Sequence, residues 1–288
     1  MDRTRAFDQV DVFAPAPLAG NPVAVVHDAD GLDDRRMQAF ARWTNLSETT
    51  FVLPPSEEGR AGGADYRLRI FTPAQELPFA GHPTLGSAHA WLERGGRPAV
   101  EGRVVQECGV GLVELRRGPA DEGASLAFRA PGLLREGPVD DGLLARVVAA
   151  LGVEPERVLR AAWIDNGPGW IGLQLDSAAT VLALEPDFAA LGDLDVGVLG
   201  AHPADGPADV EVRAFCPEYA VPEDPVTGSL NAGFAVWLCG EGVLPPAWTA
   251  RQGTAIGRHG RVQVTSDSDG SRWVGGPCRT VVSGVVAL

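Results

Sequence analysis

Three polar residues in this sequence stand where one secondary-structure element gives way to the next, and their types suit proton transfer. Glu48 lies in NLSETTFV, where a predicted helix ends and a β-branched strand begins. His82 in ELPFAGHPTLGSA and Asp224 in PEDPVTGS each precede an apolar helix. A carboxylate flanked by an imidazole and a second acid can remove a proton and return it, so the set suggests general acid–base catalysis.

Each of these residues also has a purely structural interpretation. His82 could be a partly exposed residue at a helix start, with Pro83 at the first helical position. Asp224 could be an N-cap, which stabilises a helix by about 1 kcal/mol. Glu48 could be a solvated carboxylate at a strand edge. The local sequence leaves both interpretations open for all three residues.

The two helix starts are candidate sites for an anionic substrate group. The first turn of a helix has backbone N–H groups without intrahelical partners and carries the positive end of the helix dipole. Gly81, Gly228 and Ser229 occupy these positions. They could donate hydrogen bonds to a substrate carboxylate, or they could be ordinary small helix residues. An imidazole at such a place, as in His82, is biased toward its neutral form.

Composition excludes several classes of function. The 288-residue chain has a formal net charge of −14, which would repel nucleic acid and anionic lipid. All 24 basic residues are arginine. Without lysine, the chain can form neither a pyridoxal-phosphate Schiff base nor a Walker A phosphate site. The spacing of the glycines also gives no dinucleotide-binding motif in a strand–turn–helix context.

The cysteines and histidines do not indicate a metal site or disulfides. The hydropathy pattern does not indicate a membrane segment. The four cysteines form no C-x-x-C pair and the five histidines are dispersed, so we expect no metal and free thiols. No apolar run approaches the roughly 20 residues that span a bilayer. The N-terminal residues lack the apolar region of a secretory signal, so we expect a cytoplasmic protein.

The chain contains a weak internal repeat. DYRLRIFTPAQELP begins at Asp65 and DVEVRAFCPEYAVP begins at Asp209, and both follow the pattern D-x3-R-x-F-x-P-x4-P, 144 residues apart. Each segment then passes through a small-residue turn into an apolar helix that carries Trp-Leu. Two such segments in the same order indicate duplicated α/β halves. We expect the two helix starts to face one cleft.

Hydrophobic periodicity predicts the elements around these segments. RAFDQVDVF and YRLRIF alternate as strands, and VVQECGVGLVELRR and RQGTAIGRHGRVQVT each predict a hairpin. DGLDDRRMQAFARWTN predicts a helix with Leu32, Met37, Phe40 and Ala41 on one face. DDGLLARVVAALG predicts another, with an acidic start and a glycine stop. The polar connector RGPADEGA, residues 117–124, is the best candidate domain boundary.

Several motifs in fixed order make the chain resemble the PhzF family of phenazine-biosynthesis isomerase-like proteins, which share the diaminopimelate-epimerase fold. These motifs are DVFAPAPLAGNPVAVV, NLSETTFV, RIFTPAQELPFAGHPTLGSA, NGP, RAFCPEYAVPEDPVTGS and RQGTAIGR. The resemblance implies an α+β fold of two pseudo-symmetric domains, each a curved, mostly antiparallel sheet wrapped around a central helix. The expected domains are 1–118 and 119–278, with the strand at about 279–288 packing back onto the first, and the active site in the cleft between them.

The resemblance also implies roles for individual residues. It makes Glu48 the general acid/base, His82 and Asp224 the flanking polar groups, and Gly81, Gly228 and Ser229 the substrate-binding segment. The epimerase branch uses one cysteine at each helix start. Gly81–His82 and Glu223–Asp224 stand there in this chain, which excludes a two-thiol mechanism. No cofactor is implied, and a homodimer is expected.

The sequence therefore predicts a cofactor-independent isomerase that acts on a small carboxylated biosynthetic intermediate, similar to trans-2,3-dihydro-3-hydroxyanthranilate isomerase. Two alternatives stay open at this point. The same site could hydrolyse or cleave a C–C bond of a keto-acid, or the scaffold could be a non-catalytic binding protein. The sequence does not identify the substrate, because the residues that shape a pocket are far apart along the chain.

Overall fold

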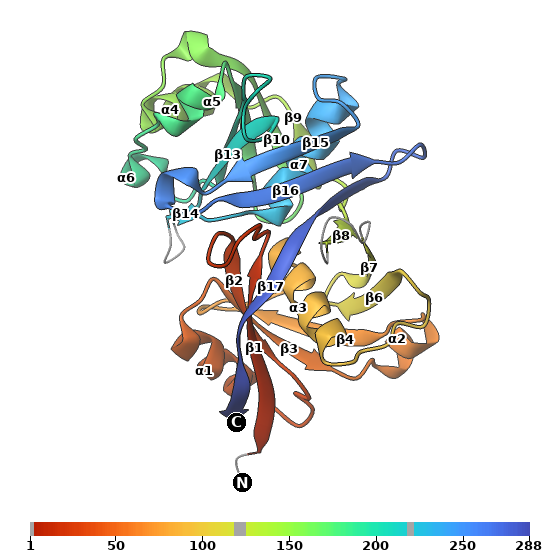
Figure 1. Ribbon diagram of the computed structural model, residues 1–288. Helices are drawn as coiled ribbons and strands as arrows, with labels where there is room; N and C mark the ends of the chain where they lie inside the picture. The colour runs from red at the N-terminus through yellow and green to blue at the C-terminus, as the bar shows by residue number, and fades with distance from the viewer. Residues whose placement is uncertain (1–2, 118–124, 218–221) are drawn as a thin grey trace. The chain divides into compact units, whose positions relative to one another are not determined.

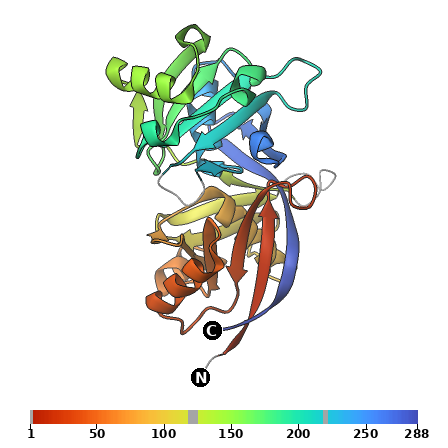
Figure 2. The same ribbon diagram turned by 90° about the vertical axis from the view of Figure 1, so that its left-hand side faces the viewer.

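The chain folds into two compact units, seen in Figures 1 and 2. The computed structural model describes residues 3–117, 125–217 and 222–288. The first unit comprises Met1–Arg129 with Gly275–Leu288, and the second comprises Ala130–Val274. The expected connector 117–124 lies outside the described residues from 118 on. No described helix is long and apolar enough to cross a membrane.

The first unit is a ring of strands closed around one helix. Each strand is hydrogen-bonded to the next, and the last returns to the first. Two neighbouring pairs, β2–β3 and β4–β6, are parallel, so the ring is mixed but mostly antiparallel. In ring order the strands are β1 (Thr4–Val12), β2 (Asn21–Val26), β3 (Glu48–Leu53), β4 (Tyr66–Phe71), β6 (Arg103–Cys108), β7 (Gly111–Arg117), β8 (Ser125–Arg129) and β17 (Arg272–Ala287).

Helix α3 (Gly81–Glu93) lies inside this ring (Figure 1). The first ten of its residues are buried, which explains why the sequence is small or apolar nearly all round rather than amphipathic. Gly86 allows the close approach, because a Cβ at this position would come within 2.4 Å of Val23 and 2.8 Å of Val12. The helix position that bears His82 is thus set by packing against β1 and β2.

Two further helices and a short strand complete the first unit. Helix α1 (Asp34–Thr44) begins at the N-cap Asp33 and ends at Asn45, which adopts a left-handed conformation. Met37, Phe40 and Ala41 are buried as predicted, while Leu32 precedes the helix and packs against the same cluster. Helix α2 (Glu57–Ala61) and strand β5 (Glu76–Leu77) lie on either side of β4 in the chain.

The second unit uses a similar order of strands. The pairing runs β9–β10–β11–β12–β13–β15–β16, with β11–β12 and β13–β15 parallel. Helix α7 (Gly228–Gly240) packs against β10, β11 and β16. The strands are β9 (Arg135–Gly137), β10 (Val158–Asp165), β11 (Ile171–Leu175), β12 (Val196–Ala201), β13 (Val210–Phe215), β14 (Glu223–Asp224), β15 (Ala247–Gln252) and β16 (Gly260–Ser266).

Three peripheral helices cover the second unit's main apolar cluster. Helix α4 has the predicted acidic N-cap, Asp140, and the predicted glycine stop, Gly152 in a left-handed conformation. Both expected hairpins form, as β6–β7 and β15–β16. The helices are α4 (Asp141–Leu151), α5 (Ala178–Leu182) and α6 (Phe188–Leu191), and 3-10 turns occur at Pro155–Arg157 and Thr254–Ile256.

The internal repeat corresponds to equivalent elements in the two units. Strands β4 and β13 begin 144 residues apart, as do β6 and β15, and both α3 and α7 have 13 residues. Each repeat also contains an arginine that forms a two-bond pair with a glutamate of the short strand that follows. These pairs are Arg69–Glu76 and Arg213–Glu223, with N–O distances of 2.6–2.9 Å.

We predict that Gly233→Ala destabilises the protein. A Cβ at Gly233 would lie 2.7 Å from the backbone oxygen of Ile164 in β10, and backbone atoms cannot move aside cheaply. Overpacking of this kind costs about 1–3 kcal/mol. Denaturant unfolding of the intact protein measures it. The control is Gly240→Ala at the exposed end of the same helix, where nothing lies within 4 Å, so unchanged or higher stability is expected.

Candidate active site

Glu48 is the first residue of β3, directly after the turn that ends α1. Asn45 is the C-cap of the helix. Across the turn, Thr44 Oγ1 and Thr49 Oγ1 are hydrogen-bonded at 2.7 Å. Residues two apart on a strand share a face, so Glu48 and Thr50 both point toward α3. Thr50 confirms this direction, because its Oγ1 lies 2.8 Å from Ser87 Oγ of that helix. The Glu48 side chain is 15% exposed.

His82 is the second residue of α3, and it is neither an N-cap nor partly exposed. The N-cap is Ala80, Pro83 is the third helical residue, and His82 is only 5% exposed. The interpretation of His82 as an exposed cap is therefore wrong, as is the placement of Pro83 at the first helical position. The physical reason is that α3 starts inside the ring of strands, where its first turn is already enclosed.

The structure brings Glu48 and His82 together. Glu48 Oε2 lies 3.3 Å from His82 Nε2. On the other side of the imidazole, His82 Nδ1 lies 3.3 Å from the side-chain amide nitrogen of Asn21. Asn21 is fully buried. Burial lowers the pKa of His82 to about 3, against the opposing effect of a hydrogen bond to the backbone of Pro22. The imidazole is therefore neutral at physiological pH, as the sequence predicted.

The Pro22 contact shows the direction of one hydrogen bond of the imidazole. Proline has no backbone N–H, so its carbonyl can only accept, and His82 must donate to it. The Asn21 amide lies at Nδ1 and Glu48 Oε2 lies at Nε2, so both ring nitrogens face polar groups.

Asp224 lies in strand β14 and does not cap helix α7. The N-cap is Thr227, so the capping interpretation of Asp224 is wrong. Its Oδ2 accepts a hydrogen bond from the hydroxyl group of Thr227 at 2.5 Å. The preceding Glu223 is buried and paired with Arg213, which fixes the strand. Because side chains alternate along a strand, Asp224 points away from this ion pair.

Gly228 and Ser229 are the first two residues of α7, as predicted. Ser229 Oγ accepts a hydrogen bond from Trp170 Nε1 at 3.0 Å, and its backbone oxygen accepts one from Asn166 at 2.8 Å. Since the Ser229 hydroxyl group accepts from the indole, its own proton is directed elsewhere. This residue is therefore oriented as a hydrogen-bond donor.

The two central helices differ from the other helices at their N-termini. Side chains cap α1, α2, α4, α5 and α6 through hydrogen bonds to first-turn N–H groups. No side chain of the described residues caps α3 or α7 in this way. Backbone N–H groups at Gly81 and at Gly228–Ser229 thus lack the side-chain caps of the other helices.

Sequence reasoning did not single out Asn21, Thr227 and Gln252. All three occur in quoted motifs, AGNP, VTGS and RQG, but amides and hydroxyls carry no titration signal that would draw attention to them. The fold brings Asn21 into contact with His82, and it brings Thr227 and Gln252 into contact with Asp224. Whether the Glu48–His82 pair and the α7 start serve one substrate stays a prediction.

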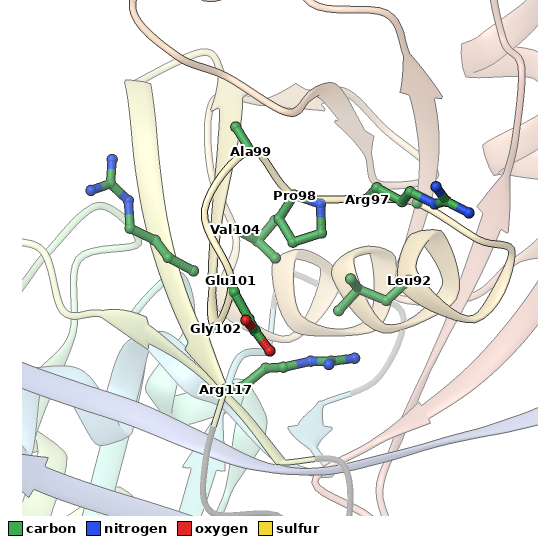
Figure 3. A pocket seen from close by; sticks show the side chains of 10 residues that line it. Leu92, Arg97, Pro98, Ala99, Glu101, Gly102, Val104 and Arg117 are labelled. Atoms are coloured by element: carbon green, nitrogen blue, oxygen red, sulfur yellow. The ribbon is translucent and has the colours of Figure 1, made fainter.

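One cavity of the structure does not involve these residues. Its volume is about 420 Å³, and it lies at the C-terminal end of α3 (Figure 3). Figure 3 shows Arg97 above the helix and Arg117 below it, so their guanidinium groups do not converge on one point. Among the described residues, no three histidine, cysteine or acidic side chains gather in a way that could hold a metal.

We predict that His82 does not titrate between pH 5 and 8. In ¹⁵N-histidine NMR spectra, its signals should be those of a neutral imidazole, with one protonated and one unprotonated nitrogen, throughout this range. His82→Gln identifies the signals by removing them. A titration midpoint near 6.5 would contradict the neutral, buried imidazole.

The burial of His82 also predicts that this residue lowers the free energy of unfolding at acidic pH. The unfolded chain binds a proton at His82 below about pH 6.5, whereas the folded chain does so only near pH 3. This residue therefore destabilises the fold as the pH falls through that window, by up to about 1.4 kcal/mol per pH unit. His82→Gln should flatten the pH dependence of the unfolding free energy by this amount, and an unchanged slope would contradict the prediction.

Comparison with known proteins agrees with the fold and the motifs. Residues 10–284 match the family described as phenazine biosynthesis-like protein, PhzC-PhzF. The chain is 38% identical to "Antisense-enhancing sequence 1" of Schizosaccharomyces pombe, with 97% of each covered. It is 37% identical to a trans-2,3-dihydro-3-hydroxyanthranilate isomerase of Pseudomonas aeruginosa, with 91% of each covered. A PhzF-family structure from Enterococcus faecalis superimposes with a TM-score of 0.80 at 26% identity, covering 99% of this chain and 100% of that one. The chain thus belongs to the PhzC-PhzF family and has its α+β, epimerase-like fold.

Proposed function

We propose that this protein is an isomerase that moves a proton within a small carboxylated intermediate, with Glu48 as the acid/base. The names of relatives over nearly the full length, including trans-2,3-dihydro-3-hydroxyanthranilate isomerase, support this reaction class and this substrate type. The observation that carries the assignment is the contact of Glu48 Oε2 with a buried, neutral His82 at 3.3 Å. A carboxylate held beside a neutral imidazole can give and take a proton without separating charge.

The proposed reaction has two proton transfers. The Glu48 carboxylate removes a proton from one carbon of the substrate and becomes a carboxylic acid. The protonated carboxyl group then returns the proton to a different carbon of the same molecule, which shifts the double bond and restores the carboxylate. Atoms and electrons balance without an oxidant, a reductant or an organic cofactor. The proposal therefore requires none.

His82 would assist the proton transfer of Glu48 as a neutral group rather than as a cation. A cationic imidazole 3.3 Å away would favour the ionised form of Glu48 and oppose protonation of its carboxylate. Neutral His82 avoids this effect and stays within 3.3 Å of the carboxyl group that gains the proton. Asn21 and Pro22 keep the ring in this orientation.

The substrate carboxylate would bind to helix N-termini. The uncapped N–H groups of Gly81, Gly228 and Ser229, and the Ser229 hydroxyl group, are suited to an anion. Asp224 would accept a hydrogen bond from an amine or hydroxyl group of a substrate. Expectations of a cytoplasmic homodimer stay predictions beside this proposal.

The test is turnover of trans-2,3-dihydro-3-hydroxyanthranilate in D₂O, followed by NMR and mass spectrometry. Wild-type protein should give one product of unchanged composition, with deuterium at the carbon that receives the proton to the extent that Glu48 exchanges with solvent. Glu48→Gln should lower kcat by at least about 10²- to 10⁴-fold, the usual contribution of a general acid/base, while the fold is kept.

The matched control is Glu57→Gln, which makes the same chemical change at an exposed residue of α2 in the same unit. It should retain wild-type turnover. Full activity of Glu48→Gln would refute the role of Glu48. Two products by mass would indicate C–C cleavage instead of isomerisation, and tight binding without turnover would indicate a binding protein.

A further inference from the structure

We propose that Gln252 is a positioning residue that fixes, through Thr227, the orientation of the Asp224 carboxylate and its hydrogen-bonding state. The role of Asp224 toward substrate rests on the proposed function. The hydrogen-bond arrangement itself rests on contacts within the second unit, all between described residues. Nothing in the local sequence of RQGTAIGR distinguishes this glutamine from a surface residue.

Gln252 is the last residue of β15, and it is fully buried at the start of α7. Its amide makes hydrogen bonds in four directions. Oε1 accepts from the Thr227 backbone N–H at 3.1 Å and from Asn231 Nδ2 at 3.0 Å. Nε2 donates to the Asp224 backbone oxygen at 3.2 Å and to Thr227 Oγ1 at 2.8 Å.

Two backbone groups determine which end of this amide is which. The Thr227 N–H can only donate, so it must face the oxygen of Gln252. The Asp224 carbonyl can only accept, so it must face the nitrogen. A flipped amide would place a donor against a donor and an acceptor against an acceptor inside a buried site, where each unmade bond costs about 1–3 kcal/mol. The amide orientation is thus fixed.

The direction of the Thr227 hydroxyl group follows from that orientation. Thr227 Oγ1 accepts from Gln252 Nε2, so its proton is directed to Asp224 Oδ2, 2.5 Å away. Oδ2 is therefore an acceptor, and any proton that Asp224 takes up must reside on Oδ1. The hydrogen bonds run from the donor Gln252 through the Thr227 hydroxyl group to the acceptor Asp224, so Oδ2 of this carboxylate is already engaged.

Asn231 holds the network from the helix side. Its Nδ2 donates to the Thr227 backbone oxygen at 2.9 Å as well as to Gln252. Asn231 is fully buried, and the helix residues that follow it to Leu238 are apolar or glycine. Its Oδ1 has no hydrogen-bond partner among the described residues, so Asn231 takes part in the network only as a donor. The network thus fixes the Asp224 carboxylate at the start of α7. Through this carboxylate, the buried residues would affect the substrate.

The first experiment removes the donor of the Gln252 side chain without changing the size of this side chain. In Gln252→Glu, the new carboxylate cannot donate from the position of Nε2, so the Thr227 hydroxyl group should turn toward it and leave Asp224 Oδ2. We expect kcat/KM to fall about 10- to 100-fold. Thr227→Val should cause a similar loss, and Thr227→Ser, which keeps the hydroxyl group, a smaller one. The control Gln263→Glu introduces the same charge on neighbouring β16 and should retain activity.

A double-mutant cycle separates positioning from general stability. If Gln252 acts through Thr227, then Gln252→Glu should cost little more in a Thr227→Val background than Thr227→Val alone. Additive losses in kcat/KM would overturn the proposal, because they would show that Gln252 and Thr227 act independently. Thermal unfolding checks that the variants fold, and Gln252→Met provides an uncharged second variant with the same expected coupling.

A readout without turnover tests the inference even if the proposed substrate is wrong. Isotope-edited infrared difference spectra against Asp224→Asn isolate the carboxylate band of Asp224. Loss of the Thr227 donor should shift this band equally in Gln252→Glu and Thr227→Val. An unshifted band in folded Gln252→Glu would overturn the inference, whereas a shifted band with no wild-type turnover would contradict only the proposed function.

Discussion

The enclosure of helix α3 by a closed ring of strands is the constraint on which the first unit's chemistry depends. Ten consecutive residues of the helix are buried, beginning at its first turn. His82 is carried into the interior with them, and desolvation keeps its imidazole neutral. The same ring places β3 beside β2, so that Glu48 meets His82 at 3.3 Å. Closure of the ring of strands therefore also sets the contact and the charge state on which the proposed acid–base chemistry depends.

The second unit shows that the same framework can hold different chemistry at its helix start. Both units use an arginine–glutamate pair to fix the short strand before the central helix, and both central helices have a glycine that permits close packing, Gly86 and Gly233. At the second helix position the first unit has His82 and the second has Ser229. The first start thus holds a buried, neutral imidazole, and the second holds a hydroxyl group beside an oriented carboxylate.

Much of the fold could be predicted from sequence because its signals are local. The strand alternation of YRLRIF, the acidic cap Asp140 and the glycine stop Gly152 act over a few residues, and the structure confirms each of them. The motif order was sufficient to predict the epimerase-like fold. The role of Asp224 at its helix was less predictable, because a carboxylate three residues before the actual N-cap, Thr227, has the local sequence pattern of a cap.

By itself the sequence determined the candidate residues, Glu48, His82 and Asp224, and the chemistry that their side chains allow. Tertiary structure decided what each group can do. Burial of α3 made His82 neutral, and Gln252 oriented the hydroxyl group that binds Asp224. Protonation state and hydrogen-bond direction depend on atoms brought together from distant strands and helices, and no local pattern of side chains encodes such contacts.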